Sequence, residues 1–96
     1  MSYNLIVRKR AEQHIADAYA WYEEQRSGLG EEFLLCIEAS LNVITENPLL
    51  FQEKHKNVRC IMTARFPYGI FYFIDKNKVV VIAVFHLSRN PKFWRT

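Results

Sequence analysis

Residues 79–85 read Val-Val-Val-Ile-Ala-Val-Phe and form the longest apolar stretch of the chain. Valine and isoleucine favour strands because their branched side chains pack well on a pleated surface. A strand that is apolar on both faces belongs inside a sheet, where other parts of the protein cover it. The stretch is far too short to cross a bilayer, which takes about 20 residues. It therefore predicts a central strand.

Residues 58–66 and 68–75 supply the strands expected beside this one. Both segments are rich in β-branched and aromatic residues, and Pro67 marks the turn between them. The polar residues 75–78 then form a short hairpin loop into the strand at 79–86. Because short connections of this kind join antiparallel strands, we expect a meander of three antiparallel strands.

Two helices are expected upstream of the meander. Apolar residues recur at helical spacing over residues 10–26, and the segment Gly28-Leu29-Gly30 ends this helix. A second apolar stripe runs over residues 31–47 and ends before Pro48, because proline disfavours helix at the preceding residue. So short a connection packs the two helices back to back as a hairpin. Residues 52–57 then form a polar loop.

Residues 3–8 alternate between apolar and polar side chains, which predicts a short N-terminal strand. The order of elements specifies an α+β fold: an N-terminal strand, a two-helix antiparallel hairpin and a three-stranded antiparallel meander, with the helices packed on one face of the sheet. The 96 residues suit a single domain, 1–96. The first residues contain no apolar run of signal-peptide length, so we expect a cytoplasmic protein without membrane contact.

Charge is distributed unevenly along the chain. Through Glu53 there are four Lys and Arg against nine Asp and Glu, or −5, and from Lys54 onward there are nine against one, or +8, which together give the net +3. This asymmetry predicts that the C-terminal half meets nucleic acid or an acidic protein segment. The alternative is a solvated basic surface that balances an acidic one. Cys36 and Cys60 lack the spacing of a metal site, and we expect neither a metal nor a cofactor.

Two arginines are expected on the open face of the sheet. Alternation along residues 58–66 places Arg59 and Arg65 on one face and an apolar set on the other, and the apolar set is expected to face the helices. The open face would then combine charge with aromatic rings able to stack on RNA bases, namely Tyr68, Tyr72 and Trp94. The alternative is that the rings lie in the core and the arginines extend over them.

One set of residues has the composition of a metal-free ribonuclease. In that chemistry the 2′-hydroxyl attacks the neighbouring phosphate, a histidine moves the proton, and arginines stabilise the charge that develops. His86 at the end of the last strand, with Arg59 and Arg89, could fill these roles. The other histidines, His14 and His55, are expected on the surface.

The order of several segments resembles the RelE/ParE toxin superfamily, the toxins of bacterial type II toxin-antitoxin pairs. The segments that carry the resemblance are ADAYAWYE at 16–23, GLGEEF at 28–33, ENP at 46–48, Val58-Arg59, RFPY at 65–68 leading to Tyr72, and VFHLSRNP at 84–91. The resemblance covers nearly the full chain and implies the same arrangement of strand, helix hairpin and antiparallel sheet.

The superfamily has two branches, and the resemblance is closer to one of them. One branch cleaves messenger RNA on the ribosome, and the ParE-like branch inhibits DNA gyrase without nuclease activity. In the nucleases an arginine follows the tyrosine that opens the strand after the turn, whereas Gly69 follows Tyr68 here. Arg59 and Arg89 resemble two of the nucleases' basic positions. The missing arginine and the helix segment 21–30 favour the ParE-like branch.

The resemblance implies a toxin that inhibits DNA gyrase without nuclease activity, and it leaves open whether the chain is an enzyme; if it is one, a metal-independent mRNA endonuclease is expected. It also implies a cognate antitoxin, encoded alongside, whose acidic segment folds over the basic sheet and the helices. The residues that we assign to partner binding are Arg59, Arg65, Tyr68, Arg89, Lys92, Trp94 and Arg95. The alternatives are a ribosome-dependent mRNA endonuclease and an inactive antitoxin-binding remnant. A homodimer and a toxin-antitoxin hetero-oligomer are both left open.

Overall fold

The computed structural model of the chain describes residues 3–88. Its elements, in chain order, are β1 (Asn4–Val7), α1 (Lys9–Gln25), α2 (Leu29–Glu46), the 3₁₀ turn η1 (Pro48–Leu50), β2 (Glu53–His55), β3 (Val58–Met62), β4 (Tyr68–Asp75) and β5 (Lys78–His86). The two predicted helices are confirmed to within two residues at each end, and α2 ends before Pro48 as expected.

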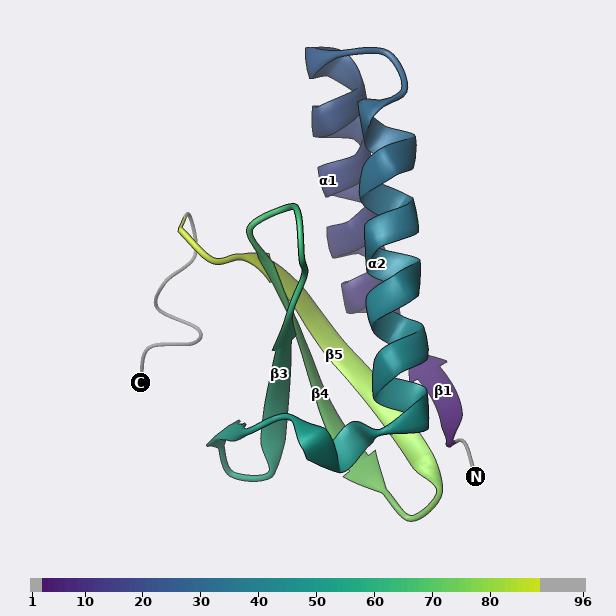
Figure 1. Cartoon of the computed structure of the whole chain (residues 1–96), viewed down its shortest axis with the longest axis vertical. Coiled ribbons are helices and arrows are strands. Elements are labelled where there is room, and N and C mark those ends of the chain that lie inside the picture. Colours follow the sequence, from purple (N-terminus) through teal and green to yellow (C-terminus); the bar gives the residue numbers. More distant parts are fainter. Residues whose placement is uncertain (1–2, 89–96) are drawn as a thin grey trace.

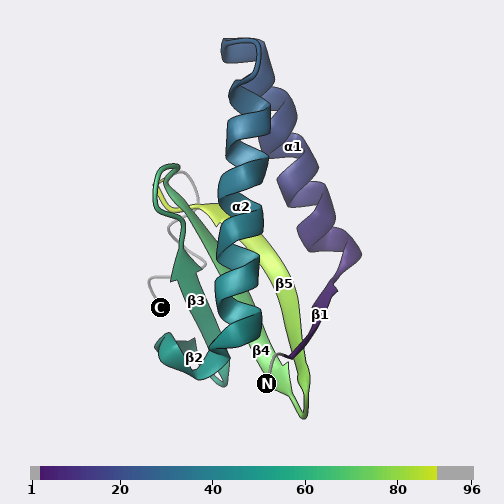
Figure 2. The same ribbon diagram turned by 45° about the vertical axis from the view of Figure 1, so that its right-hand side comes forward.

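The strands form one mixed sheet in the order β1-β5-β4-β3-β2. β1 runs parallel to β5, and the other neighbours are antiparallel. β5 therefore has a strand on each side, as its sequence predicts. The helix hairpin packs against one face of the sheet, and its tip projects beyond the sheet (Figures 1 and 2). The predicted α+β fold is confirmed.

The main core lies between the hairpin and the sheet. The largest side chains that are fully buried in the described part of the chain are Tyr72, Phe33, Ile44, Ile70, Val79 and Val81. A smaller apolar cluster lies elsewhere in the sheet and consists of Cys60, Phe71 and Ala83. The sheet is thus buried on both faces, as a strand like β5 requires.

The face assigned to β3 from its sequence is wrong. Ile61 packs in the main core, opposite Ile70 of β4, while Cys60 belongs to the second cluster, opposite Phe71. Successive residues of a strand point to opposite faces, so Ile61 faces the helices and Cys60 does not. Both residues are buried, and alternation alone could not decide which face carries the hairpin.

The ends of the predicted strands also differ from the structure. β3 stops at Met62, because residues 63–67 form a tight turn in which the Thr63 N–H donates to the Tyr68 carbonyl oxygen. A strand that was not expected, β2, lies inside the predicted loop at 52–57. Its three residues are all exposed, so no apolar pattern marks it in the sequence.

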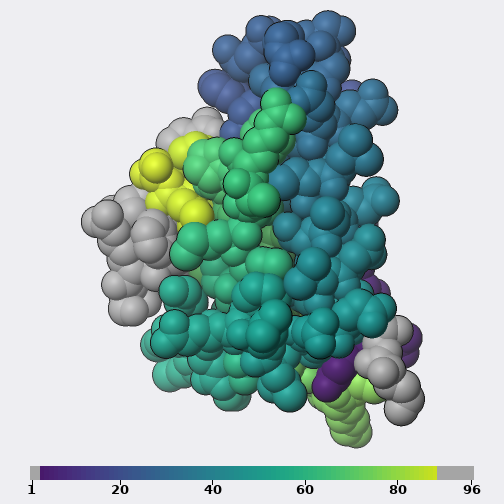
Figure 3. All heavy atoms as spheres, viewed as in Figure 1, coloured from purple at the N-terminus to yellow at the C-terminus, as the bar shows by residue number. Residues whose placement is uncertain are grey.

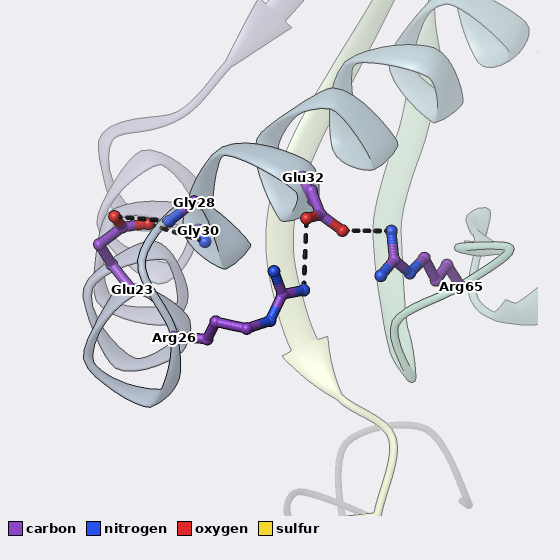
Figure 4. Close-up of polar contacts among 6 residues, drawn as sticks. All are labelled: Glu23, Arg26, Gly28, Gly30, Glu32 and Arg65. Carbon is purple, nitrogen blue, oxygen red and sulfur yellow. Dashed lines mark hydrogen bonds and ion pairs between the residues drawn. The ribbon is translucent and has the colours of Figure 1, made fainter.

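A carboxylate closes the turn between the two helices. Gly28 has φ = 89°, a left-handed conformation that glycine adopts at little cost. The Gly28 N–H donates to Glu23 Oε2 at 2.9 Å and the Gly30 N–H donates to Glu23 Oε1 at 3.0 Å (Figure 4). Glu23 thus satisfies two backbone donors at the start of α2 that the helix itself cannot pair.

Glu23→Ala should lower the free energy of unfolding by about 1–2 kcal/mol, the usual cost of losing a helix cap. Glu23→Gln keeps one acceptor oxygen and should lose less. The neighbouring exposed residue Glu24 supplies the control, since Glu24→Ala should change stability by no more than about 0.5 kcal/mol. Urea denaturation followed by circular dichroism measures all three. Equal losses for the two alanine variants would show that the cap contributes nothing.

Candidate functional site

A cleft of about 490 Å³ lies between α1 and the C-terminal end of β5. Its lining comes from α1 (His14, Asp17, Ala18 and Trp21), from β5 (Val84, Phe85 and His86) and from Tyr68 of β4. The α1 residues follow one another at i, i+3, i+4 and i+7, so they share one side of the helix. The volume falls within the range of about 300–1,000 Å³ that is usual for ligand sites.

The cleft begins where β1, the parallel neighbour of β5, ends. The register of β1 with β5 stops at Val7 and Val81, and the Arg8 N–H donates to the Val81 carbonyl oxygen. Farther along, the Val84 N–H donates to Nδ1 of His14 at 3.1 Å. The α1 side chain thus continues the pairing of the sheet edge where β1 leaves it.

His14 is half-buried, which corrects the prediction of a surface histidine. Its ring centroid lies 4.8 Å from that of Phe85. Burial lowers the pKa of His14, the charge of Arg10 lowers it further, and Asp17 acts in the opposite direction. Since Nδ1 accepts the Val84 N–H, the neutral ring carries its proton on Nε2. The remaining histidine on the predicted surface, His55, is exposed as expected.

His86 lies on the other side of the cleft. Its Nδ1 accepts the Ser88 N–H at 3.1 Å, so its neutral ring also carries a proton on Nε2. Its ring meets that of Tyr68 edge to face, with centroids 5.2 Å apart. In this form Nδ1 of each ring accepts a backbone N–H and cannot abstract a proton.

The structure does not bring Arg59 to His86. Arg59 pairs with Tyr72 and His86 pairs with Tyr68, on opposite sides of β4. At strand spacings, their backbones are separated by about 13 Å along β4 and about 10 Å across the sheet. The third residue of the proposed nuclease set, Arg89, lies outside the described residues.

Arg59 also has partners of its own. Its guanidinium donates to the Phe51 carbonyl oxygen at 2.6 Å and lies 3.5 Å from the Glu53 carboxylate, and its side chain is only 19% exposed. Because register partners share a face of the sheet, Arg59 lies on the same face as the buried Tyr72. The predicted place on an open face is therefore wrong.

Arg65 lies in the turn between β3 and β4, beyond the end of the strand. It forms an ion pair with Glu32 of α2 at 2.5 Å, and Glu32 also pairs with Arg26 (Figure 4). Hydrogen bonding from Arg65 lowers the pKa of Glu32. In the space-filling view the turn packs against the first half of α2 (Figure 3). The ion pair of Arg65 with Glu32 thus links the turn to the helix hairpin, and it lies on an exposed part of the surface.

The aromatic rings expected to stack on RNA lie in the core instead. Tyr68 and Tyr72 are buried in the main core, and the Tyr72 hydroxyl donates to the Pro48 carbonyl oxygen at 2.6 Å. Burial raises the pKa of Tyr72 to about 12. The alternative interpretation, with the rings in the core, is correct for both tyrosines. The remaining residues that the sequence assigned to partner binding, Lys92, Trp94 and Arg95, lie outside the described residues.

His14 should make stability depend on pH. The pKa of His14 in the folded state lies below the unfolded value of about 6.5. The neutral ring therefore contributes its full share to the free energy of unfolding above pH 6.5, and this share is lost as the pH falls from 6.5 through the folded-state pKa. His14→Asn removes the titration. The difference in unfolding free energy between wild type and this variant, measured by urea denaturation from pH 8 to pH 5, should shrink in acid. A difference that is independent of pH would contradict this account.

Among residues 3–88 no helix is long and apolar enough to cross a membrane. Within the same residues no three His, Cys, Asp or Glu side chains are grouped to hold a metal ion.

Comparisons with known proteins identify relatives of this fold. The chromosomal ParDE toxin-antitoxin system of P. aeruginosa matches with a TM-score of 0.75 and 12% identity, over 88% of this chain and 96% of the other. A mutant of the E. coli toxin RelE in the free state matches with a TM-score of 0.62 and 18% identity, over 97% and 92%. The intact E. coli RelBE toxin-antitoxin complex matches with a TM-score of 0.56 and 20% identity, over 86% and 94%.

These identities are low, and the structural likeness shows the fold alone. No curated protein sequence matches the chain. The sequence profile described as the ParE toxin of the type II toxin-antitoxin system, parDE, matches residues 5–91, nearly the whole chain. The chain therefore belongs to the ParE toxin family of type II toxin-antitoxin systems.

Proposed function

We propose that this chain inhibits DNA gyrase and is neutralised by a cognate antitoxin encoded beside it. The observation that carries the proposal is the match of residues 5–91 to the ParE toxin family. The resemblance stated above associates the ParE-like branch with gyrase and the other branch with cleavage of messenger RNA.

The packing around Gly69 supports the ParE-like branch. In the ribosome-dependent nucleases an arginine occupies the position that follows the tyrosine. Here a Cβ atom at Gly69 would lie 2.9 Å from Sγ of Cys60 and 2.9 Å from Cδ2 of Leu87. These contacts are shorter than packed atoms tolerate, so Cys60 and Leu87 would have to shift before any larger side chain could stand at position 69.

The placement of the candidate catalytic residues also supports the ParE-like branch. A ribonuclease needs its proton-transfer group and its cations around one phosphate. Arg59 is bonded to Phe51 and Glu53 and lies two strands away from His86. The second ring nitrogen of His86, Nδ1, accepts a backbone N–H. The described residues therefore favour a protein that acts by binding.

Unpaired basic side chains support an acidic partner. Within residues 3–88 the ion pairs use Arg26, Arg59 and Arg65, and other cations are exposed without one. Lys56 lies in the turn between β2 and β3, and Lys76 in the turn between β4 and β5. Both turns lie at the same end of the sheet (Figure 1). An acidic antitoxin segment would be complementary to this end of the molecule.

Induction of the chain in a bacterial host without antitoxin tests the proposal. Thymidine and amino-acid incorporation are followed in parallel with radiolabel. Gyrase inhibition should reduce thymidine incorporation first, because replication forks need supercoil removal. Co-expression of the antitoxin should restore growth.

Two other outcomes would overturn the proposal. Early loss of amino-acid incorporation, abolished by His86→Ala, would indicate cleavage of messenger RNA on the ribosome. Normal growth after induction of folded protein would indicate a remnant that only binds the antitoxin.

A further inference from the structure

Two adjacent leucines are the most exposed large apolar side chains in the described part of the chain. Leu49 is 65% exposed and Leu50 is 71% exposed, and both belong to the 3₁₀ turn η1. A single exposed leucine needs no explanation, because more than half of a typical protein surface is apolar. An adjacent pair keeps more apolar surface in water, which is typical of a surface that a partner covers.

Hydrogen bonds from the sheet hold these leucines in their exposed position. The Tyr72 hydroxyl of β4 donates to the Pro48 carbonyl oxygen at 2.6 Å. The Arg59 guanidinium of β3 donates to the Phe51 carbonyl oxygen, also at 2.6 Å. Pro48 precedes the two leucines and Phe51 follows them, so the sheet anchors η1 on both sides. A partner that binds the leucines therefore meets a backbone that is already ordered, and it loses little affinity to ordering it.

Lysines lie at the same end of the molecule as η1. This end also contains the turn between β2 and β3, with Lys56, and the turn between β4 and β5, with Lys76 (Figures 1 and 2). Both lysines are exposed. Residues 46–59 and 75–78 together hold five Lys and Arg against three Asp and Glu. The residues outside the described part of the chain, 1–2 and 89–96, contain no acidic side chain that could reverse this excess.

The two turn lysines occupy backbone positions that favour other residues. Lys56 has φ = 39° and Lys76 has φ = 57°, and both values lie in the left-handed region. Glycine and asparagine adopt this conformation at a lower cost than lysine, and they are the usual residues of hairpin turns. Lysine at these positions therefore lowers stability, which is expected where a residue serves binding instead.

We propose that η1 and the two turns form the docking surface for an acidic amphipathic segment of the cognate antitoxin. In such a segment apolar residues are flanked by Asp or Glu. Leu49 and Leu50 would contact the apolar residues, and Lys56 and Lys76 would lie beside the carboxylates. The inference rests on the antitoxin of the proposed function, and it does not depend on gyrase as the target.

Other occupants fit this surface less well. A basic segment would be repelled by the lysines. Nucleic acid would pair with the lysines, but its phosphates would leave the leucines without an apolar partner. A second copy that docked through the same patch would bring like charges together around the leucines. An acidic amphipathic segment complements both the charge and the apolar side chains.

Isothermal titration calorimetry of the full chain with the purified antitoxin tests the leucines. The double variant Leu49→Ser with Leu50→Ser should bind at least about tenfold more weakly, because both apolar contacts are lost. Leu35→Ser is the matched control, since Leu35 is 64% exposed and lies about three helical turns before the end of α2. This control should bind as tightly as the wild type.

A second double variant tests the lysines. Lys56→Asn with Lys76→Asn removes both charges and introduces a residue that suits a left-handed turn, so the fold should be retained. Its affinity should fall about fivefold at about 0.05 M salt and less at about 0.5 M salt, where screening weakens the charge contacts. Lys9→Asn changes an exposed lysine at the start of α1 and should have no such effect. Circular dichroism checks that each variant is folded.

Three results would overturn the proposal. If the antitoxin binds and neutralises the wild type, and both double variants bind it equally well, the surface is wrong while the proposed function stands. If the antitoxin does not bind the wild type at all, the antitoxin of the proposed function fails as well. If the leucine variant binds antitoxin normally but loses self-association in sedimentation velocity, the surface belongs to a second copy of the chain.

Discussion

The outer edge of β5 determines how the rest of this molecule is arranged. β5 has nine residues and its parallel neighbour β1 has four, so the edge needs another partner beyond Val81. Backbone donors in a buried edge must be paired. α1 starts directly after β1 and supplies the His14 ring for the Val84 N–H. That bond links the helix to the strand edge, beside the core packing of Ala11, Ala18 and Tyr22.

The cleft of the candidate site follows from this arrangement. With His14 at the edge of β5, Asp17 and Trp21 lie one turn and two turns farther along the same side of α1, opposite Phe85 and His86. A strand in place of the helix would cover the edge and leave no cleft. The molecule thus gains a concave site because β1 is shorter than β5.

The fold was largely readable from the sequence, and the exceptions have physical causes. The period of the apolar residues shows the hairpin, and Pro48 and Gly28 mark helix ends. β2 is short and fully exposed, so it has no apolar pattern to detect. β3 has a buried apolar residue on each face, Cys60 on one and Ile61 on the other, and its register with β4 decides which of them meets the helices.

The candidate site was harder to predict from the sequence, because it depends on tertiary contacts. His14, Asp17 and Trp21 follow a helical spacing beside the core stripe, and that signal was present in the sequence. Nothing in the sequence shows that β1 ends early enough to expose β5 to this stripe. Arg59 has the residue type of a catalytic cation. Only its contacts with Phe51 and Glu53 show that it also links β3 to the segment that precedes it.

The most direct test of a toxin that acts by binding is the supercoiling of relaxed plasmid by purified gyrase at increasing concentrations of the purified chain. The account predicts that supercoiling is lost at about micromolar concentrations, and that purified antitoxin restores it. Unchanged supercoiling, together with cleavage of messenger RNA on purified ribosomes by the same preparation, would contradict it.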